Sequence, residues 1–454
     1  MKTKRFDVIV IGSGSGLTIS SRAADLGYKV AVVEKGPFGG TCLNRGCIPS
    51  KMLIHSADVM EVIRNAETFG IKANVEKIDW KKMQQRVWKE IDRDAKSIEL
   101  GNKETKNITV YKKTGAFAGK KVLKVGNELI SAEKIFICAG TRPSIPKING
   151  LENVRHYISD DVMRLQKQPK KMIIVGGGYI SAELGHFFSS LGTEVIMLVR
   201  GNCLIKNEDE DISIAYTRIA PRKYTVLFNS EIIKVGKKGK EIDVEINQRE
   251  KKKKITCDAL LLATGRIPNT DILAVEKTGV KVSKEGYVKV NEYMETNVPG
   301  IWAIGDIAGV YFFKHSANLE ASYCANNAFS KNKIKVDYYA MPHAIFTSPQ
   351  IAGVGMTEQE LKERKIKYFV GKYNYINTGM GAAINDKEGF VKVLVNKDGK
   401  ILGCHIIGSD ASTLIHEVIV AMKAGLGVKG ILDAVHIHPA LSEVVQRAFG
   451  NVRY

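Results

Sequence analysis

Short apolar runs that end in glycine-rich turns dominate the first part of the chain. Residues 6–11 read FDVIVI, and the turn GSGSG at 12–16 follows directly. The segment LTISSRAADLG at 17–27 has helical character, and a second apolar run, YKVAVV at 28–33, comes after it. A strand, a glycine turn, a helix and a second strand form the layout of a dinucleotide-binding unit. We therefore predict such a unit at the start of the chain.

The chemistry of this turn suits a nucleotide. Gly12 and Gly14 would allow the backbone to approach a pyrophosphate, and the following helix N-terminus would favour its negative charge. Glu34 stands 20 residues beyond Gly14 and would accept hydrogen bonds from a ribose. The G-x-G-x-x-G pattern needs a glycine at position 17, where this chain has Leu17. Gly16, just before it, could compensate.

The same layout occurs a second time. Residues 172–200 read MIIVGGGYISAELGHFFSSLGTEVIMLVR, which again predicts strand, glycine turn, helix and strand. Gly176 and Gly178 take the glycine places, and Ser181 takes the third small-residue place. An internal duplication of this kind indicates an enzyme with two dinucleotide cofactors.

The second unit ends in a cation. Arg200 follows the strand EVIMLV, and Lys206 lies a turn beyond it. An acid at this place would bind the 2′-hydroxyl of NAD, whereas an arginine suits a 2′-phosphate. A surface cation at a strand end is the simpler alternative. We expect NADPH, with NADH as the other possibility.

The rest of the pattern predicts the domain organisation. IFICAGTRPSIP at 135–146 and ALLLATGRIPNT at 259–270 each read as a strand with a proline-rich exit, and PGIWAIGDIAG at 299–309 delivers Asp306 beside glycines. From about residue 337, alternating strands and a helix predict an antiparallel sheet with helices. The class is thus α/β with two Rossmann-like domains and a C-terminal α+β domain. The predicted segments are 1–146 and 265–336 for the first nucleotide domain, 147–264 for the second, and 337–454 for the C-terminal domain.

Composition adds limits to this picture. With 454 residues the chain is too long for one core. It has no apolar run of 18 residues, and its start does not resemble a signal peptide, so we expect a cytoplasmic protein without a membrane span. The formal charge of +20 indicates a solvated basic surface that would attract anionic dinucleotides. A nucleic-acid-binding protein with a vestigial redox fold is a competing hypothesis, but no recognition motif supports it.

The segment GGTCLNRGCIPSK at 39–51 holds the one close cysteine pair in the sequence, Cys42 and Cys47. A closed zinc site needs four ligands, and no second pair or nearby histidine completes it, so we predict no metal. A structural disulfide is improbable in a cytosolic chain, which leaves a redox-active dithiol. Residues five apart in a helix rise by about 7.5 Å, too far for a disulfide. We therefore expect slack at Gly46 and a helix that becomes regular only around residues 49–51.

A redox dithiol needs an electron donor and a group that moves protons. Two nucleotide sites would supply a path from nicotinamide through flavin to the disulfide. HIHPALSEVVQ at 436–446 offers His438 with Glu443 five residues later and Pro439 between them. A lone histidine is most often structural, but this grouping favours an acid–base catalyst oriented by a carboxylate.

Together these stretches resemble the flavin-dependent pyridine nucleotide–disulfide oxidoreductases, over essentially the whole chain. GGTCLNRGCIPSK, the ATGR and GDIA segments and HIHPALSE carry the resemblance. Within the family, IGSGSG, SDDVMRL, VRGNCLI and FTSPQIAGVG are most similar to the mycothione reductase branch. The C-terminus lacks the cysteine pair that mercury- or thioredoxin-reducing relatives carry there.

The resemblance implies a role for each matching residue. Cys47 would face the flavin, and Cys42 would attack the substrate. Lys51 would lie near the flavin, paired with Glu183, and Tyr179 would cover the flavin where nicotinamide enters. Further FAD or nucleotide contacts would come from a set of residues in the matching motifs: Glu34, Gly40, Thr41, Gly265, Arg266 and Asp306.

The resemblance also implies partners and a reaction. His438 and Glu443 would reach the active site from a second subunit, so an obligate homodimer follows. The implied activity is NADPH-dependent reduction of a low-molecular-weight disulfide through FAD. The alternative is a dihydrolipoamide dehydrogenase, which works in the opposite direction with NAD and which typically has an acid at the place of Arg200.

Overall fold

The first glycine turn lies at the end of a parallel strand. In the computed structural model, which describes residues 2–453, β1 pairs in parallel with β2 and with β6. The sheet order is β3-β2-β1-β6-β5-β4, and β17 pairs with β6. The strands are β1 (Lys4–Ile11), β2 (Val30–Val33), β3 (Ile108–Tyr111), β4 (Gly115–Gly119), β5 (Val122–Val125), β6 (Glu128–Ile137) and β17 (Ile301–Ala303). Because β17 follows the whole second unit in sequence, two separate parts of the chain build this sheet.

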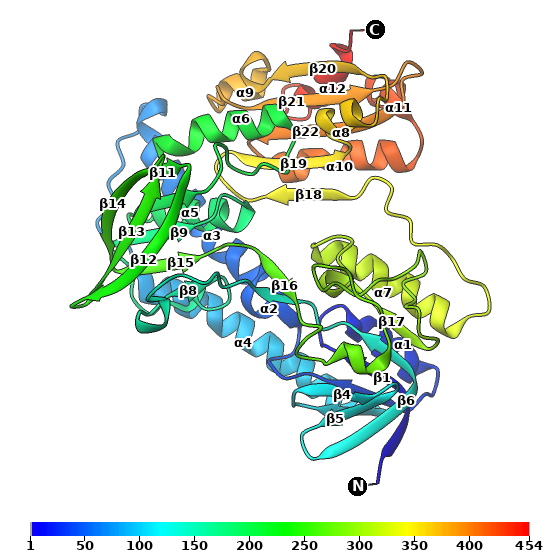
Figure 1. Cartoon of the computed structure of the whole chain (residues 1–454). Coiled ribbons are helices and arrows are strands. Elements are labelled where there is room, and N and C mark those ends of the chain that lie inside the picture. The colour runs from blue at the N-terminus through cyan, green and yellow to red at the C-terminus, as the bar shows by residue number, and fades with distance from the viewer. Residues whose placement is uncertain (1, 454) are drawn as a thin grey trace.

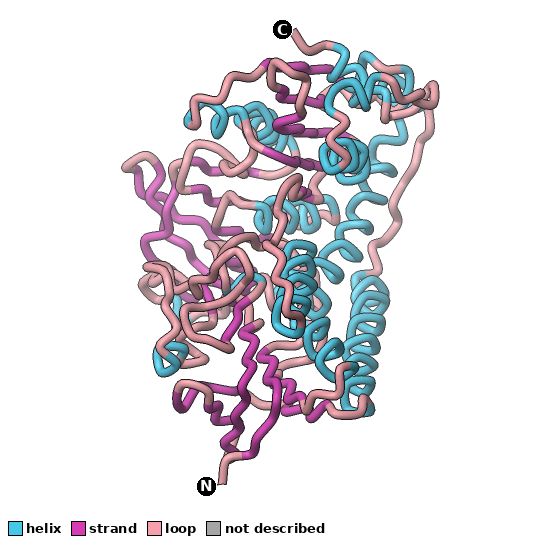
Figure 2. Tube along the Cα trace, turned by 90° about the vertical axis from the view of Figure 1, so that its right-hand side faces the viewer, coloured by secondary structure: helices cyan, strands magenta, loops and turns pink. Residues whose placement is uncertain are grey.

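Helices flank this sheet and extend from it toward the second unit. Helix α1 packs against both β1 and α7, while α3 packs against α4 and against α5 of the second unit. In Figure 2 the helices run along one side of the molecule, beside the strands. Their bounds are α1 (Gly16–Asp25), α2 (Gly40–Arg45), α3 (Cys47–Asn65), α4 (Trp80–Glu104) and α7 (Lys314–Phe329).

The second unit has its own parallel sheet, in the order β11-β10-β9-β15-β8, and a separate antiparallel sheet, β12-β13-β14. The predicted crossing segments meet here, because β7 (Thr141–Pro143) pairs with β16 (Arg266–Pro268). The other elements are β8 (Tyr157–Ile158), β9 (Lys171–Val175), α5 (Tyr179–Ser190), β10 (Glu194–Val199), α6 (Glu210–Ile219), β11 (Thr225–Phe228), β12 (Ser230–Lys238), β13 (Glu241–Gln248), β14 (Lys251–Cys257) and β15 (Ala259–Leu262).

The last part of the chain forms the predicted antiparallel sheet with helices. Its order is β18-β19-β22-β21-β20, and α10 and α12 pack on it. Figure 1 shows this sheet at the end of the molecule away from the N-terminus. Its elements are β18 (Pro342–Ile345), β19 (Gln350–Gly355), α8 (Glu358–Glu363), β20 (Phe369–Asn374), α9 (Gly379–Ala383), β21 (Phe390–Val395), β22 (Ile401–Gly408), α10 (Ala411–Lys423), α11 (Gly427–Leu432) and α12 (Glu443–Gly450).

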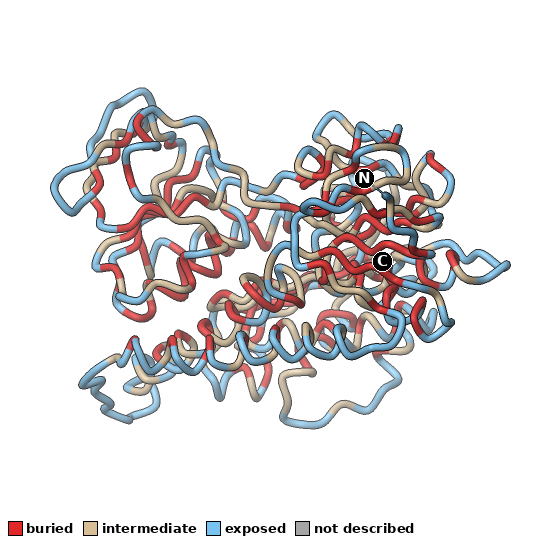
Figure 3. Tube along the Cα trace, turned by 90° about the horizontal axis from the view of Figure 1, so that it is seen from below, coloured by how far each residue is buried: buried red, intermediate tan, exposed pale blue. Residues whose placement is uncertain are grey.

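Burial follows the apolar runs of the sequence. Val8, Ile9 and Val10 of β1 and Ile173 and Ile174 of β9 are completely buried, as expected for strands covered on both faces. In the view from below, buried positions lie on the strands and on the inward faces of the helices (Figure 3). The predicted α/β class, with two units built on parallel strands and a C-terminal antiparallel sheet with helices, is therefore confirmed.

A buried ion cluster joins the second unit to the C-terminal sheet. The Nζ atom of Lys392 on β21 lies 2.8 Å from Oδ1 of Asp209 and 2.6 Å from Oε2 of Glu358. The side chains of Lys392 and Asp209 are 1% and 0% exposed. Burial opposes ionisation of Asp209, but the nearby His405 and the Lys392 ammonium hold its pKa below the usual value. Removing one partner of such a buried pair leaves an uncompensated charge.

We expect Lys392→Met to lower the free energy of unfolding by about 3–5 kcal/mol. The loss should exceed that of Lys397→Met, which removes an exposed lysine from the turn between β21 and β22. Because the pKa of Asp209 is lowered by folding, its contribution is complete above 3.8, the ordinary aspartate value, and disappears as the pH falls below it. The difference in unfolding free energy between the two variants, measured by denaturant unfolding, should therefore be large at pH 7 and become smaller in acid. Equal midpoints for the two variants at pH 7 would contradict this role.

Candidate functional site

A break in the backbone brings the two cysteines together. Helix α2 ends at Arg45, and α3 begins at Cys47, with Gly46 between them at φ −136° and ψ −117°. A β-carbon at Gly46 would lie 2.9 Å from the carbonyl oxygen of Thr41, so only glycine allows this approach. The expected slack at Gly46 is confirmed. The expectation that the helix becomes regular only around residues 49–51 was wrong, because the single glycine absorbs the whole bend.

The two thiols have opposite acidities. Both are free, and the Cys42 thiol donates a hydrogen bond to the Cys47 sulfur. That bond, together with burial and the nearness of Cys47, raises the pKa of Cys42 well above its usual value. The same bond lowers the pKa of Cys47 to about 7, against burial and with help from the Lys51 ammonium. Near neutral pH the reduced pair therefore carries its proton on Cys42 and its negative charge on Cys47.

Lys51 is fixed by Glu183, the carboxylate that the family resemblance implied as its partner. Its Nζ atom lies 2.8 and 2.9 Å from the two oxygens of Glu183 on α5, and 4.6 Å from the centre of the Phe346 ring. Glu183 is 6% exposed and also accepts a hydrogen bond from the Phe346 N–H. This contact ties the cysteine helix, the second unit and the start of the C-terminal sheet to one point.

The first glycine turn has the close contacts that a nucleotide-binding turn needs. Gly12 has φ +107°, and a β-carbon there would lie 2.3 Å from the Cys138 carbonyl oxygen. A β-carbon on Gly16 would lie 2.8 Å from Val10, so Gly16 takes the close helix-to-strand packing place that the pattern assigns to position 17. Glu34 accepts hydrogen bonds from the Ser13 N–H and hydroxyl and from the Gly36 N–H.

The loop before the cysteines packs against the first glycine turn. Gly40 has φ +68°, and a β-carbon there would lie 2.8 Å from the α-carbon of Gly14. Thr41, next to it, is exposed. The Gly14 and Gly40 backbones thus form a surface free of side chains beside a helix N-terminus, which fits a pyrophosphate.

Asp306 is held by residues of the two crossing strands. Its carboxylate accepts a hydrogen bond from the Thr141 hydroxyl at 2.9 Å. Arg266 donates to the hydroxyl and carbonyl oxygens of Thr141, at 2.8 and 2.9 Å. Burial raises the pKa of Asp306, while Thr141 and Arg266 oppose that shift. Gly265, with φ +109°, has open space where a β-carbon would be.

The second glycine turn is built in the same way. A β-carbon on Gly176 would lie 2.3 Å from the Ala263 carbonyl oxygen, whereas at Gly178 nothing lies within 4 Å. Ser181 is completely buried under the turn, as its small-residue place requires. Tyr179, the first residue of α5, remains 44% exposed, and burial of its hydroxyl end raises its pKa.

The two predicted phosphate-binding cations lie on the surface. The Arg200 side chain is 85% exposed, and its Nε atom is 3.9 Å from Glu231. Lys206 is exposed as well. An ion pair this long and exposed contributes little, so the Arg200 guanidinium is available to a ligand.

His438 and Glu443 meet at the start of α12. Nδ1 of His438 is 3.0 Å from Oε1 of Glu443, and the Ala440 N–H donates to the other oxygen. The hydrogen bond with His438 is the main cause that lowers the pKa of Glu443, and the bond from Ala440 adds to it. The carboxylate therefore stays ionised and orients the imidazole. The His438 side chain is 76% exposed, which leaves its other nitrogen open for proton transfer.

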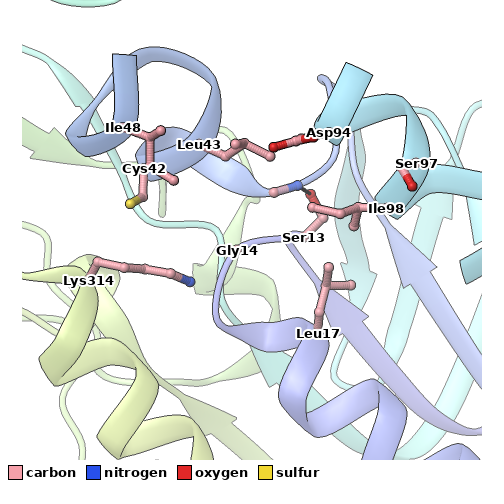
Figure 4. Close-up of a pocket in the computed structure, with 11 residues that line it drawn as sticks. Ser13, Gly14, Leu17, Cys42, Leu43, Ile48, Asp94, Ser97, Ile98 and Lys314 are labelled. Atoms are coloured by element: carbon pink, nitrogen blue, oxygen red, sulfur yellow. Dashed lines mark hydrogen bonds between the residues drawn. The ribbon is translucent and has the colours of Figure 1, made fainter. Parts of the chain in front are cut away.

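A pocket of about 500 Å³ lies beside Cys42. Figure 4 shows that the Cys42 sulfur and the Lys314 side chain lie on one side of it and that Leu17 and Ile98 lie on the other. The full lining is Ser13, Gly14, Leu17, Gly39, Cys42, Leu43, Ile48, Asp94, Ser97, Ile98 and Lys314. Sequence reasoning missed Lys314, Asp94 and Ser97, because they come from helices far from the cysteines in sequence.

Comparison with known proteins gives the family. The family model described as pyridine nucleotide–disulphide oxidoreductase matches residues 6–328, and the dimerisation domain of the same family matches residues 341–449. The chain belongs to the pyridine nucleotide–disulfide oxidoreductases. The chain is 37% identical to mycothione reductase of Mycobacterium tuberculosis (strain H37Rv), over 99% of both chains. It is 32% identical to dihydrolipoyl dehydrogenase of Bacillus subtilis (strain 168), over 97% of this chain and 95% of that one.

A solved structure agrees with this assignment. The HOCl-induced flavoprotein disulfide reductase RclA from Escherichia coli superposes with a TM-score of 0.88 at 27% identity, over 98% of this chain and all of that one. This pyridine nucleotide–disulfide oxidoreductase is therefore an FAD-dependent flavoenzyme that uses a pyridine nucleotide, acts on sulfur groups and carries a dimerisation domain. The glycine surface of Gly14 and Gly40, with Glu34 at its end, fits FAD.

Two other classes of site find no support in the geometry. Between residues 2 and 453, no three His, Cys, Asp or Glu side chains are grouped so that they could hold a metal ion. Over the same residues, no helix combines the length and the apolar character that crossing a bilayer requires.

The acidity of Cys47 gives a direct prediction for this oxidoreductase. In the reduced protein, alkylation of Cys47 by iodoacetamide should follow a pKa of about 7, because only the thiolate reacts. Cys42→Ala removes the main hydrogen-bond donor and should move that pKa upward, whereas Cys42→Ser keeps a donor and should move it less. Rates come from mass spectrometry of the peptide that holds position 47. A pKa near the ordinary value of 9.0 in the unmutated protein would refute the assigned hydrogen bond.

Proposed function

We propose that this enzyme is an NADPH-dependent reductase of a low-molecular-weight disulfide, similar in action to mycothione reductase. The observation that carries the proposal is the cysteine pair, in which Cys42 holds the proton and Cys47, near Lys51, is the more acidic thiol. A pair with unequal acidities suits two separate tasks, one toward the cofactor and one toward the substrate. The 37% identity with mycothione reductase over nearly the whole chain supports the same reading.

The cofactor would be held by residues of the first unit. Gly12, Gly14 and Gly40 would face the pyrophosphate of FAD, Glu34 its adenosine ribose, and Asp306 the region between ribityl and pyrophosphate. Thr41 and Arg266 would support these contacts at the two edges. Bound FAD would supply the electron path from the nicotinamide to the disulfide.

The two thiols would divide the chemistry on sulfur. Cys47 would face the cofactor, with the Lys51 ammonium held beside it by Glu183. Cys42 would be the thiol that attacks the substrate, because Cys47 takes the place beside Lys51 and the cofactor. Tyr179 would lie over the cofactor at the second glycine turn, where Gly176, Gly178, Ser181 and Gly265 leave room for the nicotinamide nucleotide.

The acid–base group would come from a second subunit. His438 makes no hydrogen bond to the cysteine helices within residues 2–453, and Val435 and Ile437 beside it are 100% and 78% exposed. Apolar side chains this exposed favour burial against a partner. In the dimer, His438 would protonate the thiolate that leaves the substrate and later take a proton from Cys42, while Glu443 keeps the imidazole in place.

The nucleotide preference rests on Arg200 and Lys206. Arg200 directly follows β10, where a 2′-hydroxyl-binding acid would otherwise stand, and Lys206 lies in the loop after it. Both are exposed, and they favour the 2′-phosphate of NADPH. The competing function is NAD-linked oxidation of dihydrolipoamide, and the 32% identity with dihydrolipoyl dehydrogenase supports it. Initial rates with NADPH and NADH, and with lipoamide against other disulfides, separate the two.

For the nucleotide, Arg200→Glu should lower kcat/KM for NADPH about 10- to 150-fold more than for NADH, the range of a charged hydrogen bond. Arg364→Glu makes the same charge change at an exposed site on the C-terminal domain and should leave the ratio unchanged. Equal kcat/KM values of the unmutated enzyme for NADH and NADPH would already refute the proposed preference for NADPH.

For the acid–base group, His438→Ala should lower disulfide turnover about 10²- to 10⁴-fold. The first half-reaction, NADPH oxidation, does not involve this proton and should keep its rate. The disulfide turnover of Glu443→Gln should lie between those of His438→Ala and the unmutated enzyme. Glu443 orients the imidazole but does not itself transfer the proton. Stopped-flow measurement of the two half-reactions decides this, and an equal loss in both would point to damaged folding.

Sharing of the site between subunits can be tested separately. Inactive Cys42→Ser and His438→Ala proteins should regain activity after they are unfolded and refolded together. Random pairing makes about half of the dimers mixed, and one of the two sites in each would be intact, which gives about a quarter of full activity. No recovery from verified mixed dimers would place His438 and Cys42 of one chain in the same site.

A further inference from the structure

Helix α5 carries a stripe of polar side chains, three of which contact the cysteine helix α3. The stripe consists of Tyr179, Glu183, His186 and Ser190, whose spacings of four, three and four residues place them on one face of α5. The two helices pack against each other (Figure 1). Glu183 makes the first contact, with Lys51, and two further contacts follow that have no part in the chemistry on sulfur.

His186 makes the second contact between the helices. Its Nε2 atom lies 2.9 Å from Oδ1 of Asp58 on α3, and its Nδ1 atom lies 3.1 Å from the Ser190 hydroxyl. The His186 side chain is 2% exposed, so water does not replace either partner. The ring therefore bridges α3 and the last turn of α5 from inside the helix contact.

Ser190 makes the third contact. Its hydroxyl donates to Oε1 of Glu61 on α3 at 2.8 Å, and the other Glu61 oxygen accepts from Lys223 at 2.6 Å. Because a hydroxyl has a single proton, Ser190 can only accept from the His186 ring, and an ionised Asp58 carboxylate can also only accept. His186 therefore donates from both ring nitrogens, which fixes the orientation of the ring.

Apolar packing holds the two helices together but does not determine how far one slides along the other. One buried cluster contains side chains of both helices, among them Leu53 and Ala57 of α3 and Leu184 and Phe187 of α5. Attraction between such side chains has no direction, whereas the three polar contacts are satisfied together at one register only. At another register the buried His186 ring would lose its partners, which costs free energy.

We propose that His186 is a positioning residue for flavin reduction, because its bonds to Asp58 and Ser190 fix α5, and with it the nicotinamide site at the start of α5, against the cysteine helix. The inference rests on the proposed function in that it takes the turn 176–178 as the nicotinamide nucleotide site. Seven residues, or about 10 Å of helix, separate His186 from Tyr179, so His186 acts only through the helix. A displacement of about 1 Å between reacting groups can cost about 10²-fold in rate.

The first test measures flavin reduction, in which the nucleotide loses a hydride and the flavin gains it. Stopped-flow at saturating nucleotide, NADPH or NADH, gives the limiting rate for flavin-loaded protein. His186→Leu should lower this rate at least about 10-fold. His186→Gln keeps one donor and should lose less.

Two neighbouring serines give a matched pair of variants. Ser190→Ala removes the third contact with α3 and should lower the limiting rate as well. Ser189→Ala removes a hydroxyl that bonds within α5, to the His186 carbonyl oxygen at 3.3 Å, and should leave the rate unchanged. If His186→Leu does not fold, this pair decides, and equal rates in the two serine variants would overturn the inference.

The second test reports on the helix without any turnover. Hydrogen–deuterium exchange of flavin-loaded protein, with no nucleotide present, should be faster over residues 179–190 in His186→Leu and unchanged in the C-terminal sheet. Faster exchange with an unchanged limiting rate would overturn the inference, because His186 would then only stabilise the fold. A slowed rate with unchanged exchange would overturn it too, since the effect would not pass through α5.

Failure of the proposed function gives a different result. In that case the unmutated enzyme, once its flavin is reduced by NADPH or NADH, would reduce no low-molecular-weight disulfide. The rates of flavin reduction in the His186 and serine variants would still be measured.

Discussion

The contact between Cys42 and Cys47 across Gly46 is the constraint on which the rest of the structure depends. Five residues of regular helix would hold the two sulfurs too far apart for a disulfide. The glycine bend lets the end of α2 and the start of α3 approach, and a single hydrogen bond then makes the two thiols chemically different. Because the Cys47 pKa is about 7, the reduced pair carries a thiolate at neutral pH without a strong external base.

The surrounding domains fix this pair between the two glycine turns. Lys51 on the cysteine helix binds Glu183 on α5, the helix that follows the second glycine turn and begins at Tyr179. Arg266 and Thr141 connect the crossing strands to Asp306. The buried Lys392–Asp209 pair holds the second unit against the C-terminal sheet. Electron transfer over short distances needs this kind of rigid positioning, since small displacements cost large factors in rate.

Much of this could be predicted from the sequence because local rules determine it. The glycine turns, the bend at Gly46 and the His438–Glu443 pair each occupy one short segment with a clear backbone or chemical requirement. Lys51 with Glu183 was accessible through the family resemblance, although 132 residues separate them. The packing place of Gly16 was open in sequence, because either Gly16 or Leu17 could have faced β1.

Long-range contacts without a motif could not be predicted. Lys314 reaches the cysteine pocket only because α7 packs against α1, and Asp94 and Ser97 reach it only through the placement of α4. Lys392 lies in a strand that reads as an apolar run with one lysine, and its partner Asp209 belongs to another domain. The exact start of α3 depended on how much of the bend one glycine can absorb.

The central claim is that Cys42 and Cys47 exchange two electrons with a pyridine nucleotide through the bound flavin. The direct measurement is anaerobic titration of the purified flavoenzyme with NADPH, followed by rapid alkylation in denaturant and mass spectrometry of the peptide that contains residues 42 and 47. The account predicts no alkylation of this peptide in the oxidised enzyme and modification of both cysteines after NADPH. Free thiols before reduction, or a pair that stays unmodified while NADPH is consumed in the presence of a disulfide, would contradict it.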